Sequence, residues 1–161
     1  MLRSLENKVA WVTGAGTGIG EAGAIALTQA GMHVVLSGRR REKLAEVASQ
    51  CGDAVSIEML DVADHDAVAD VAQRIIATHG RIDVLVASAG INVKERNWHN
   101  VSLDDWDSVI RIDLDGAFYC CKAVLPTMKA QGEGLILNIS SWAGKHVSVV
   151  TGPAYTAAKH A

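Results

Sequence analysis

Thr13-Gly14-Ala15-Gly16-Thr17-Gly18-Ile19-Gly20 stands between the apolar run Val9-Ala10-Trp11-Val12 and an Ala-rich stretch that ends at Gly31. This order predicts a strand, a tight glycine turn and a helix that stops at a glycine. Glycines at such a turn allow a pyrophosphate to approach backbone N–H groups at the positive end of the helix. The stretch therefore predicts a dinucleotide-binding turn at the start of an α/β fold.

The spacing of the glycines indicates which of them make the turn. A literal GxGxxG pattern occurs only at Gly18, Gly20 and Gly23, and this register lies too deep in the predicted helix. The register Gly14, Gly18 and Gly20 fits the end of the strand better. A Walker A loop is excluded because no Gly-Lys-Ser/Thr follows. The residues predicted to contact the cofactor here are Gly14, Gly16, Thr17, Gly18, Ile19 and Gly20.

The rest of the chain repeats the alternation of strand and helix. Further strands are predicted at residues 33–36, 55–59, 82–87 and 135–139. The strand at 55–59 alternates apolar and polar residues, which favours an outer position with one wetter face. Strands and helices that alternate in this way need right-handed crossovers and give a doubly wound, Rossmann-like parallel sheet in three α/β/α layers. Because no linker or repeat interrupts the pattern, residues 1–161 are predicted to form one domain.

A long helix with a well-marked start is predicted after the fourth strand. Ser102 and Asp105 have the spacing of a capping box, and Val101 and Trp106 that of a hydrophobic staple. Pro126 is expected to kink or end this helix.

Composition places the chain among ordinary globular proteins. It has 161 residues, 49% of them hydrophobic and 20% charged, with a formal net charge of −3. It has no basic, aromatic-interleaved face for nucleic acid and no apolar stretch of membrane-spanning length. The three cysteines, Cys51, Cys120 and Cys121, form no CxxC pair and are expected to be small core residues in a reducing compartment. We therefore expect a cytoplasmic protein with no nucleic-acid partner, no membrane partner and no metal site.

The end of the second strand should meet the adenosine ribose. Ser37-Gly38-Arg39-Arg40 has no carboxylate to repel a 2′-phosphate, and Arg39 could bind one through two N–H donors. NADP(H) is therefore favoured and NAD(H) remains possible, while the arginines could also simply begin a solvated helix. Asp61, after the third strand, could accept a hydrogen bond from the adenine amino group. It could equally cap the next helix, as could Asp64.

A tyrosine and a lysine near the end of the chain have the spacing of one helical turn. Tyr155 and Lys159 would project from one face of a helix, where the ammonium favours the ionised phenol. Such a phenol can exchange a proton with an alcohol or a ketone. Upstream, Asn138-Ile139-Ser140-Ser141 ends the fifth strand at the edge where open α/β sheets bind ligands, and a hydroxyl there could hold a substrate oxygen. Either serine could also be an ordinary strand terminator, and the Tyr155 and Lys159 pair an ordinary surface pair.

Asp113 is unexpected because it falls on the buried stripe of the long helix. It lies seven positions after Trp106 and four before Ala117. An ionised carboxylate there needs a partner. It could be a buried cap or ion pair, or a polar link to Lys159.

Together these residues resemble those of the short-chain dehydrogenase/reductase family. The TGxxxGxG element of that family matches residues 13–20, its Asp-Val pair matches Asp61-Val62, and its Ser and YxxxK match Ser141, Tyr155 and Lys159. The resemblance implies an NAD(P)-dependent oxidoreductase that moves a hydride between nicotinamide C4 and a secondary alcohol or ketone. It also implies that Tyr155 is the general acid/base, that Lys159 supports it and holds the nicotinamide ribose, and that Ser141 orients the substrate.

Three departures from the family pattern stand out. The family's Asn-Asn-Ala-Gly is Ala87-Ser88-Ala89-Gly90 here, in which Ala89 and Gly90 remain predicted cofactor contacts. Asp113 replaces the Asn that usually completes the catalytic set, so it is counted here as a candidate catalytic residue with an uncertain proton relay. Family members also continue with two further strands and a segment that closes over substrate, so the chain is expected to be truncated after its fifth strand. Trp142, His146 and Val147 are expected near the pocket.

Two other classes of function compete with this interpretation. The departures favour a non-catalytic NAD(P)-binding module or a redox sensor. A serine hydrolase that uses Ser141 with His146 would leave the glycine turn without a purpose. By family resemblance the expected partners are a small alcohol or carbonyl substrate and further copies of the chain, in a homodimer or homotetramer.

Overall fold

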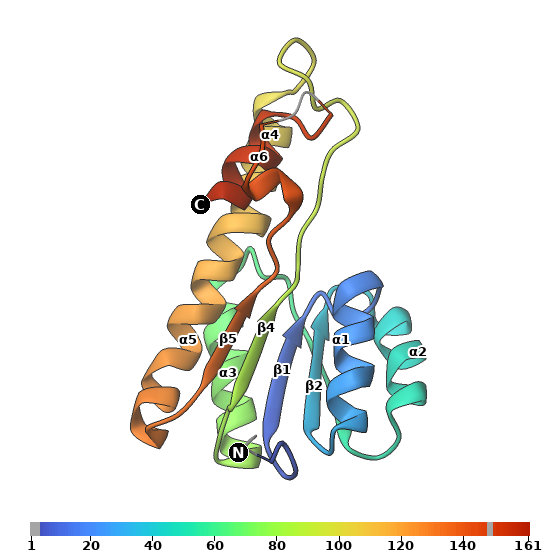
Figure 1. The fold of residues 1–161 in the computed structure, drawn as a ribbon, viewed down its shortest axis with the longest axis vertical. Helices are drawn as coiled ribbons and strands as arrows, with labels where there is room; N and C mark the ends of the chain where they lie inside the picture. The colour runs from blue at the N-terminus through green and yellow to red at the C-terminus, as the bar shows by residue number, and fades with distance from the viewer. Residues whose placement is uncertain (1–3, 148–149) are drawn as a thin grey trace.

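The computed structural model describes residues 4–147 and 150–161 and contains one parallel sheet (Figure 1). Its strand order is β3-β2-β1-β4-β5 and every neighbouring pair is parallel. The chain reverses its direction of travel across the sheet between β1 and β4, which is the switch point where open α/β sheets bind ligands. The strands are β1 Val9–Thr13, β2 His33–Gly38, β3 Val55–Met59, β4 Val84–Ala87 and β5 Leu135–Asn138.

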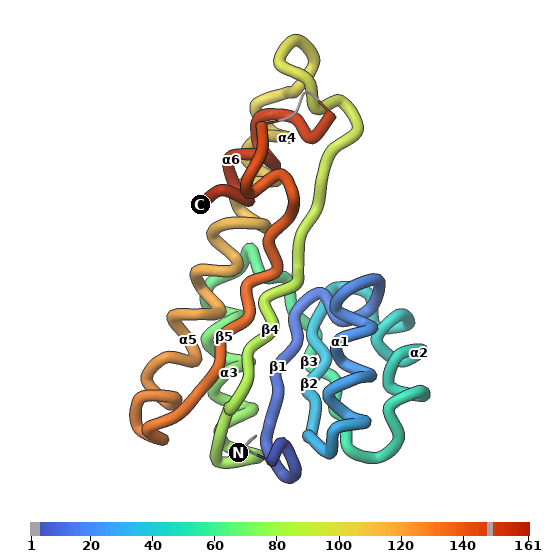
Figure 2. The backbone as a smooth tube through the Cα atoms, in the orientation of Figure 1, coloured from blue at the N-terminus to red at the C-terminus, as the bar shows by residue number. Residues whose placement is uncertain are grey.

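Helices cover both faces of the sheet, as Figures 1 and 2 show. One buried cluster joins the sheet to α1 and α2, and another joins its other face to α3 and α5. The predicted doubly wound α/β fold in three layers is therefore confirmed. The helices are α1 Gly18–Gln29, α2 Arg41–Cys51, α3 His65–His79, α4 Leu103–Ile110, α5 Gly116–Gln131 and α6 Pro153–His160.

The outer strands differ from the central ones, as the sequence predicts for β3. β1 and β4 are buried throughout, whereas every residue of β3 is at least partly exposed. β5 forms the other edge, with Leu135 and Leu137 about half exposed. An edge strand has an unpaired row of backbone groups and a less covered face, so both β3 and β5 are wetter than the strands between them.

The long helix after β4 is continuous but not uniform. Ser102 accepts a hydrogen bond from the Asp105 backbone N–H at 3.0 Å, which is one half of the predicted capping box. A π-helical turn, Arg111–Asp115, joins α4 to α5. Pro126 lies inside α5, so the expectation that it ends the helix is wrong. The last turn of α5 follows it, and the helix stops at Gly132 in the left-handed conformation.

The cysteines are free thiols. Cys51 and Cys120 are buried core residues as expected, and Cys121 is half-buried. Burial raises the pKa of Cys120 to about 12, so this thiol stays protonated and poorly nucleophilic at neutral pH.

Within the described ranges, no helix has both the length and the apolarity that crossing a bilayer requires. In the same part of the chain, no group of three or more His, Cys, Asp or Glu side chains is arranged to hold a metal ion.

Candidate active site

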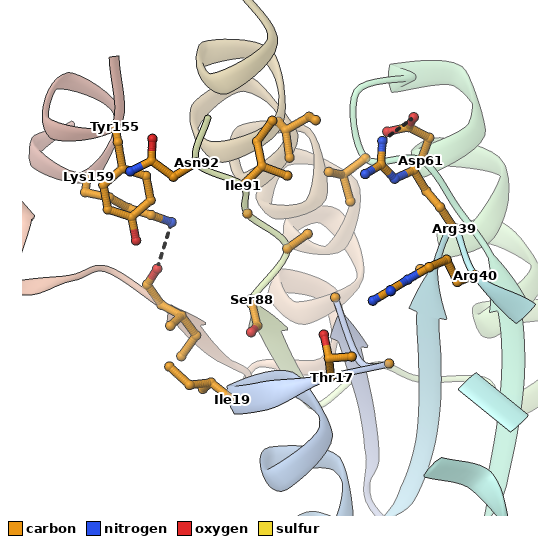
Figure 3. Close-up of a pocket in the computed structure, with 18 of the residues that line it drawn as sticks. Thr17, Ile19, Arg39, Arg40, Asp61, Ser88, Ile91, Asn92, Tyr155 and Lys159 are labelled. Carbon is orange, nitrogen blue, oxygen red and sulfur yellow. Dashed lines mark hydrogen bonds and ion pairs between the residues drawn. The ribbon is translucent and has the colours of Figure 1, made fainter. Parts of the chain in front are cut away.

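A cavity of about 600 Å³ lies at the carboxyl edge of the sheet, between the glycine turn and α6. It brings together residues from most of the length of the chain (Figure 3). The predicted site residues that line it are Gly14, Gly16, Thr17, Ile19, Arg39, Asp61, Val62, Ala89, Gly90, Tyr155 and Lys159. Gly18, Gly20, Asp113 and Ser141 lie outside this lining, and so do Trp142, His146 and Val147.

Close packing explains the glycines at the turn. Gly14 has a φ of +64°, and a Cβ on it would lie 2.8 Å from Ala89 Cα. A Cβ on Gly20 would overlap the carbonyl oxygen of Gly14. Gly23, by contrast, has no heavy atom near the position a Cβ would take. The register Gly14 and Gly20 is therefore the one that the packing requires, as the strand end predicts.

Thr13 is a structural link that the sequence did not reveal. Its hydroxyl accepts hydrogen bonds from the backbone N–H groups of Ser88 at 3.2 Å and Ala89 at 3.3 Å. The loop after β4, which lacks the amide side chains of the family pattern, is thereby tied to the end of β1. Thr13 and Ser88 are 75 positions apart, so no local pattern could have shown the contact.

Arg39 and Asp61, the two residues predicted at the adenosine end, lie close together. Arg39 Nη1 is 3.8 Å from Asp61 Oδ2, and both side chains are about half exposed. Asp61 also accepts a hydrogen bond from the Ala63 N–H, but Asp64 is the residue that caps α3. Arg40 and Lys43 line the cavity as well, and Figure 3 shows Arg40 and Arg39 at the same end of it. Arg40 is exposed and precedes the first residue of α2, so it lines the cavity and also begins a solvated helix.

Tyr155 and Lys159 lie on α6, which packs against α4 through Val109, Ala154 and Ala158. The Lys159 ammonium is 5.5 Å from the centroid of the Tyr155 ring. Its Nζ donates a hydrogen bond to the Ile139 carbonyl at 3.2 Å, at the end of β5 (Figure 3). The side chain of Lys159 is only 10% exposed. The geometry thus fixes the ammonium between the end of the sheet and the phenol ring.

Asp113 lies in the π-helical turn, and its side chain contacts the Lys159 ammonium. Its Oδ1 accepts a hydrogen bond from the Ile91 N–H at 2.7 Å, and its Oδ2 is 3.3 Å from Lys159 Nζ. That second contact is an ion pair without a directed hydrogen bond, and Oδ2 has no hydrogen-bond partner among the described residues. Burial raises the pKa of Asp113, although the Ile91 N–H and the Lys159 ammonium oppose this shift.

The ion pair also explains why Gly90 is a glycine. A Cβ on Gly90 would lie 3.0 Å from Asp113 Oδ2 and 3.3 Å from Lys159 Nζ. Asp113 is therefore in contact with Lys159 and is not a helix cap. Whether it takes part in catalysis stays a prediction.

The two serines after β5 have different partners. Ser141 Oγ accepts a hydrogen bond from the Ala143 N–H at 3.2 Å and begins a short 3-10 helix, Trp142–Gly144. Ser140 lines the cavity and donates a hydrogen bond to the Lys159 carbonyl at 2.9 Å. His146 stacks on Trp142, with their ring centroids 4.8 Å apart. In the part of the chain that the structure describes, no hydrogen bond joins His146 to Ser141, so the geometry of a serine hydrolase is not present.

Comparison with known proteins agrees with this geometry. The family model described as short chain dehydrogenase matches residues 8–161. An uncharacterized oxidoreductase of Staphylococcus aureus is 40% identical over 145 residues, which cover 89% of this chain and 62% of that protein. The chain thus spans less than two thirds of the length of such curated relatives.

Two solved structures have the same fold as this chain. A metagenomic short-chain oxidoreductase in complex with NADP is 39% identical, with a TM-score of 0.91 over 98% of this chain and 72% of the other. Serine dehydrogenase from Escherichia coli is 35% identical, with a TM-score of 0.87 over 94% of this chain and 70% of the other. From the family match and these identities together, the chain belongs to the short-chain dehydrogenase family of oxidoreductases.

Proposed function

We propose that the protein is an NADP(H)-dependent oxidoreductase that interconverts a secondary alcohol and a ketone, with Tyr155 as its general acid/base. One observation carries the proposal. Tyr155 and Lys159 line the same cavity as the glycine turn, at the switch point of the sheet. A nicotinamide held there would lie against the phenol, which is the arrangement that proton transfer to or from the substrate oxygen needs.

The residues of the cavity fit a dinucleotide along its whole length. The turn that contains Gly14 and Gly16 opens onto the start of α1, where backbone N–H groups favour a pyrophosphate. Asp61 and Val62 line the cavity and would face the adenine, and Ala89 and Gly90 line it and would face the nicotinamide. When bound, the nicotinamide supplies or accepts the hydride.

The remaining steps belong to side chains of this chain. In the reduction, the Tyr155 hydroxyl gives its proton to the ketone oxygen; in the oxidation, the Tyr155 phenolate takes the proton from the alcohol. The Ile139 carbonyl and Asp113 hold the Lys159 ammonium beside the phenol. Ser141 lies outside the cavity lining, next to Ser140, which belongs to it. Its Oγ accepts a hydrogen bond from the Ala143 N–H, so its own hydrogen remains to donate to a substrate oxygen that reaches this end of the cavity.

The test of this function replaces Tyr155 by Phe in the complete protein. Cofactor absorbance is followed with a panel of ketones and secondary alcohols. We expect turnover by the parent and a loss of at least about 100-fold in the variant, in line with the loss of a general acid/base, with cofactor affinity retained. A parent that binds NADPH but turns over no member of the panel would instead favour a non-catalytic binding module or sensor.

Preference for NADP(H) is part of the same proposal. Arg39, Arg40 and Lys43 bring three cations to the adenosine end, where Asp61 is the only carboxylate of the described cavity lining. The solved relative in complex with NADP supports this preference. Replacing Arg39 by Ala should lower the affinity for NADPH about 10-fold or more, as expected for a charge-assisted contact, and leave that for NADH nearly unchanged. Equal affinities of the parent and the Arg39→Ala variant for NADPH would contradict the proposed role of Arg39 in this preference.

A homodimer or homotetramer, in the cytoplasm, completes the proposal. α5 exposes Phe118 and Leu125, with fractional exposures of 58% and 41%, on one face of the molecule. Large exposed apolar side chains of this kind are common where protein chains associate. Light scattering of the complete protein in solution tests this, and a monomer at micromolar concentration would contradict it.

A further inference from the structure

Arg96 is a cation of the cavity that the proposed cofactor does not explain. It lines the same cavity as Tyr155 and Lys159 and is half-buried. The described residues that line this cavity include one carboxylate, Asp61, and the cations Arg39, Arg40, Lys43, Arg96 and Lys159. The first three lie toward the adenosine end and Lys159 serves Tyr155, so Arg96 is left without an assigned role.

Packing places Arg96 at the catalytic end of the cavity. A Cβ on Gly152 would overlap the Arg96 carbonyl oxygen and lie 2.8 Å from Arg96 Cβ. Gly152 is the N-cap of α6, and Tyr155 lies in the first turn of that helix. The segment that carries Arg96 therefore packs directly against the start of the catalytic helix.

A second contact holds the same segment in place. The Asn92 side chain donates a hydrogen bond to the Thr151 carbonyl at 3.1 Å, and both residues line the cavity. Figure 3 shows Asn92 at the end of the cavity where Tyr155 and Lys159 lie. The segments 91–96 and 150–152 thus pack against each other, and residues of both segments line the cavity together with Tyr155.

The guanidinium of Arg96 has no carboxylate partner among the described residues. Its one hydrogen bond there is a long one, 3.5 Å, from Nη1 to the Val93 carbonyl. Glu95, the nearest carboxylate in the sequence, instead accepts a hydrogen bond from the Asn100 side chain. The planar fork of an arginine matches a carboxylate through two parallel N–H donors, so the guanidinium of Arg96 is suited to bind one.

We propose that Arg96 binds a carboxylate of the substrate, so that the enzyme acts on hydroxy acids and the corresponding oxo acids. This inference rests on the proposed function and narrows its substrate class. The carboxylate would occupy the Arg96 end while the carbinol or carbonyl carbon faces Tyr155. Arg96 is then a residue that determines specificity, and it takes no part in the proton transfer.

The test compares acids with neutral analogues of the same shape. The complete protein is assayed with NADP⁺ on straight-chain 2- and 3-hydroxy acids, each paired with its methyl ester. The parent should prefer at least one acid to its ester. Replacing Arg96 by Met should raise KM for that acid about 10- to 100-fold, as expected for loss of a hydrogen bond to a charged group, and leave KM for the ester unchanged.

Matched variants separate this effect from a general loss of charge or fold. Replacing Lys94 by Met removes one positive charge from an exposed position of the same segment, and it should leave both KM values unchanged. Replacing Arg96 by Lys should restore part of the preference for the acid. NADPH affinity, measured by fluorescence titration, should be the same in all variants.

Two outcomes would overturn the inference and leave the proposed function standing. One is a parent that oxidises the esters as well as every acid. The other is an Arg96→Met variant in which KM rises equally for acid and ester. A parent that binds NADPH but oxidises neither kind of compound, nor any ketone or alcohol in the Tyr155 assay, would overturn the proposed function and this inference with it.

Discussion

At the scale of single residues, Asp113 adds a negative charge beside Lys159 and close to Tyr155. Its buried carboxylate lies 3.3 Å from the Lys159 ammonium, which in turn lies 5.5 Å from the Tyr155 ring centroid. The anion offsets part of the field by which the ammonium favours a phenolate. Asp113 also accepts a hydrogen bond from the Ile91 N–H, and the side-chain oxygen of an asparagine at position 113 could accept the same bond. Charge and hydrogen bonding can therefore be separated by one substitution.

Replacing Asp113 by Asn should move the pH–rate profile for alcohol oxidation toward lower pH. The ammonium would act on the phenol without the opposing anion, so we expect the half-maximal rate on the order of one pH unit lower. Steady-state rates across pH measure this. The matched control is Asp107→Asn, which removes an exposed charge from the neighbouring α4. An unchanged profile, or a movement to higher pH, would show that Asp113 does not act on the pair through its charge.

The glycine turn and α1 act together at the scale of elements. The turn brings β1 and the loop after β4 so close that Gly14 contacts Ala89 and Gly20 contacts Gly14. Thr13 adds two hydrogen bonds across the same gap. The glycine turn is therefore packed and hydrogen-bonded between the end of β1 and the loop after β4.

Replacing Gly20 by Ala should weaken NADPH binding about 10- to 100-fold. The new Cβ would overlap the Gly14 carbonyl, and relieving such overpacking costs about 1–3 kcal/mol. The matched control is Gly23→Ala in the same helix, where a Cβ meets no heavy atom within 4 Å. The Gly23→Ala variant should bind NADPH as the parent does. Its free energy of unfolding should be about 0.5–1 kcal/mol higher than that of the parent. Equal NADPH affinity in the two variants would contradict this account of the turn.

An ion-pair network at the opposite edge of the sheet matters for the whole molecule. Asp83 accepts hydrogen bonds from the Val9 N–H at 2.8 Å and from Arg81 Nε at 2.7 Å. Lys8 and Arg81 both also contact Glu133, just before β5. The network ties the starts of β1, β4 and β5 together. Burial opposes the ionised form of Asp83, but Arg81, the Val9 N–H and Lys8 outweigh it and hold its pKa below the ordinary value.

Replacing Asp83 by Asn should lower the free energy of unfolding at pH 7 by about 2–4 kcal/mol, since it removes the buried charge that accepts from the Val9 N–H and leaves Arg81 with Glu133 as its remaining carboxylate partner. Because the pKa of Asp83 is lowered in the folded state, its carboxylate stabilises the fold at any pH above the unfolded-state pKa of about 3.8. This stabilisation is lost as the pH falls through the folded-state pKa of Asp83. The difference from the parent should therefore shrink toward pH 3. Urea denaturation across pH measures it, with the exposed Asp70→Asn as the control. A difference that is independent of pH would contradict the network.

Local sequence patterns were enough to predict the alternation of elements, the glycine turn and the YxxxK pair. Each of these features repeats at helical or strand spacing or occupies consecutive positions, so a short window of residues contains it. The same is true of the edge position of β3, which its alternating residues indicate. Pro126 was expected to kink or end the long helix, and of these two effects the structure excludes the end, because α5 continues past Pro126 to Gln131.

The sequence by itself determined the fold class, the glycine turn and the position of the candidate acid/base, because periodicity and spacing specify local structure. Only the tertiary structure decided which side chains meet across the cavity. Thr13 holds the loop after β4, Asp113 contacts Lys159 from a π-helical turn, and Arg96 packs beside the start of α6. These contacts join positions far apart in the chain. They arise from how the layers pack, which no local spacing encodes.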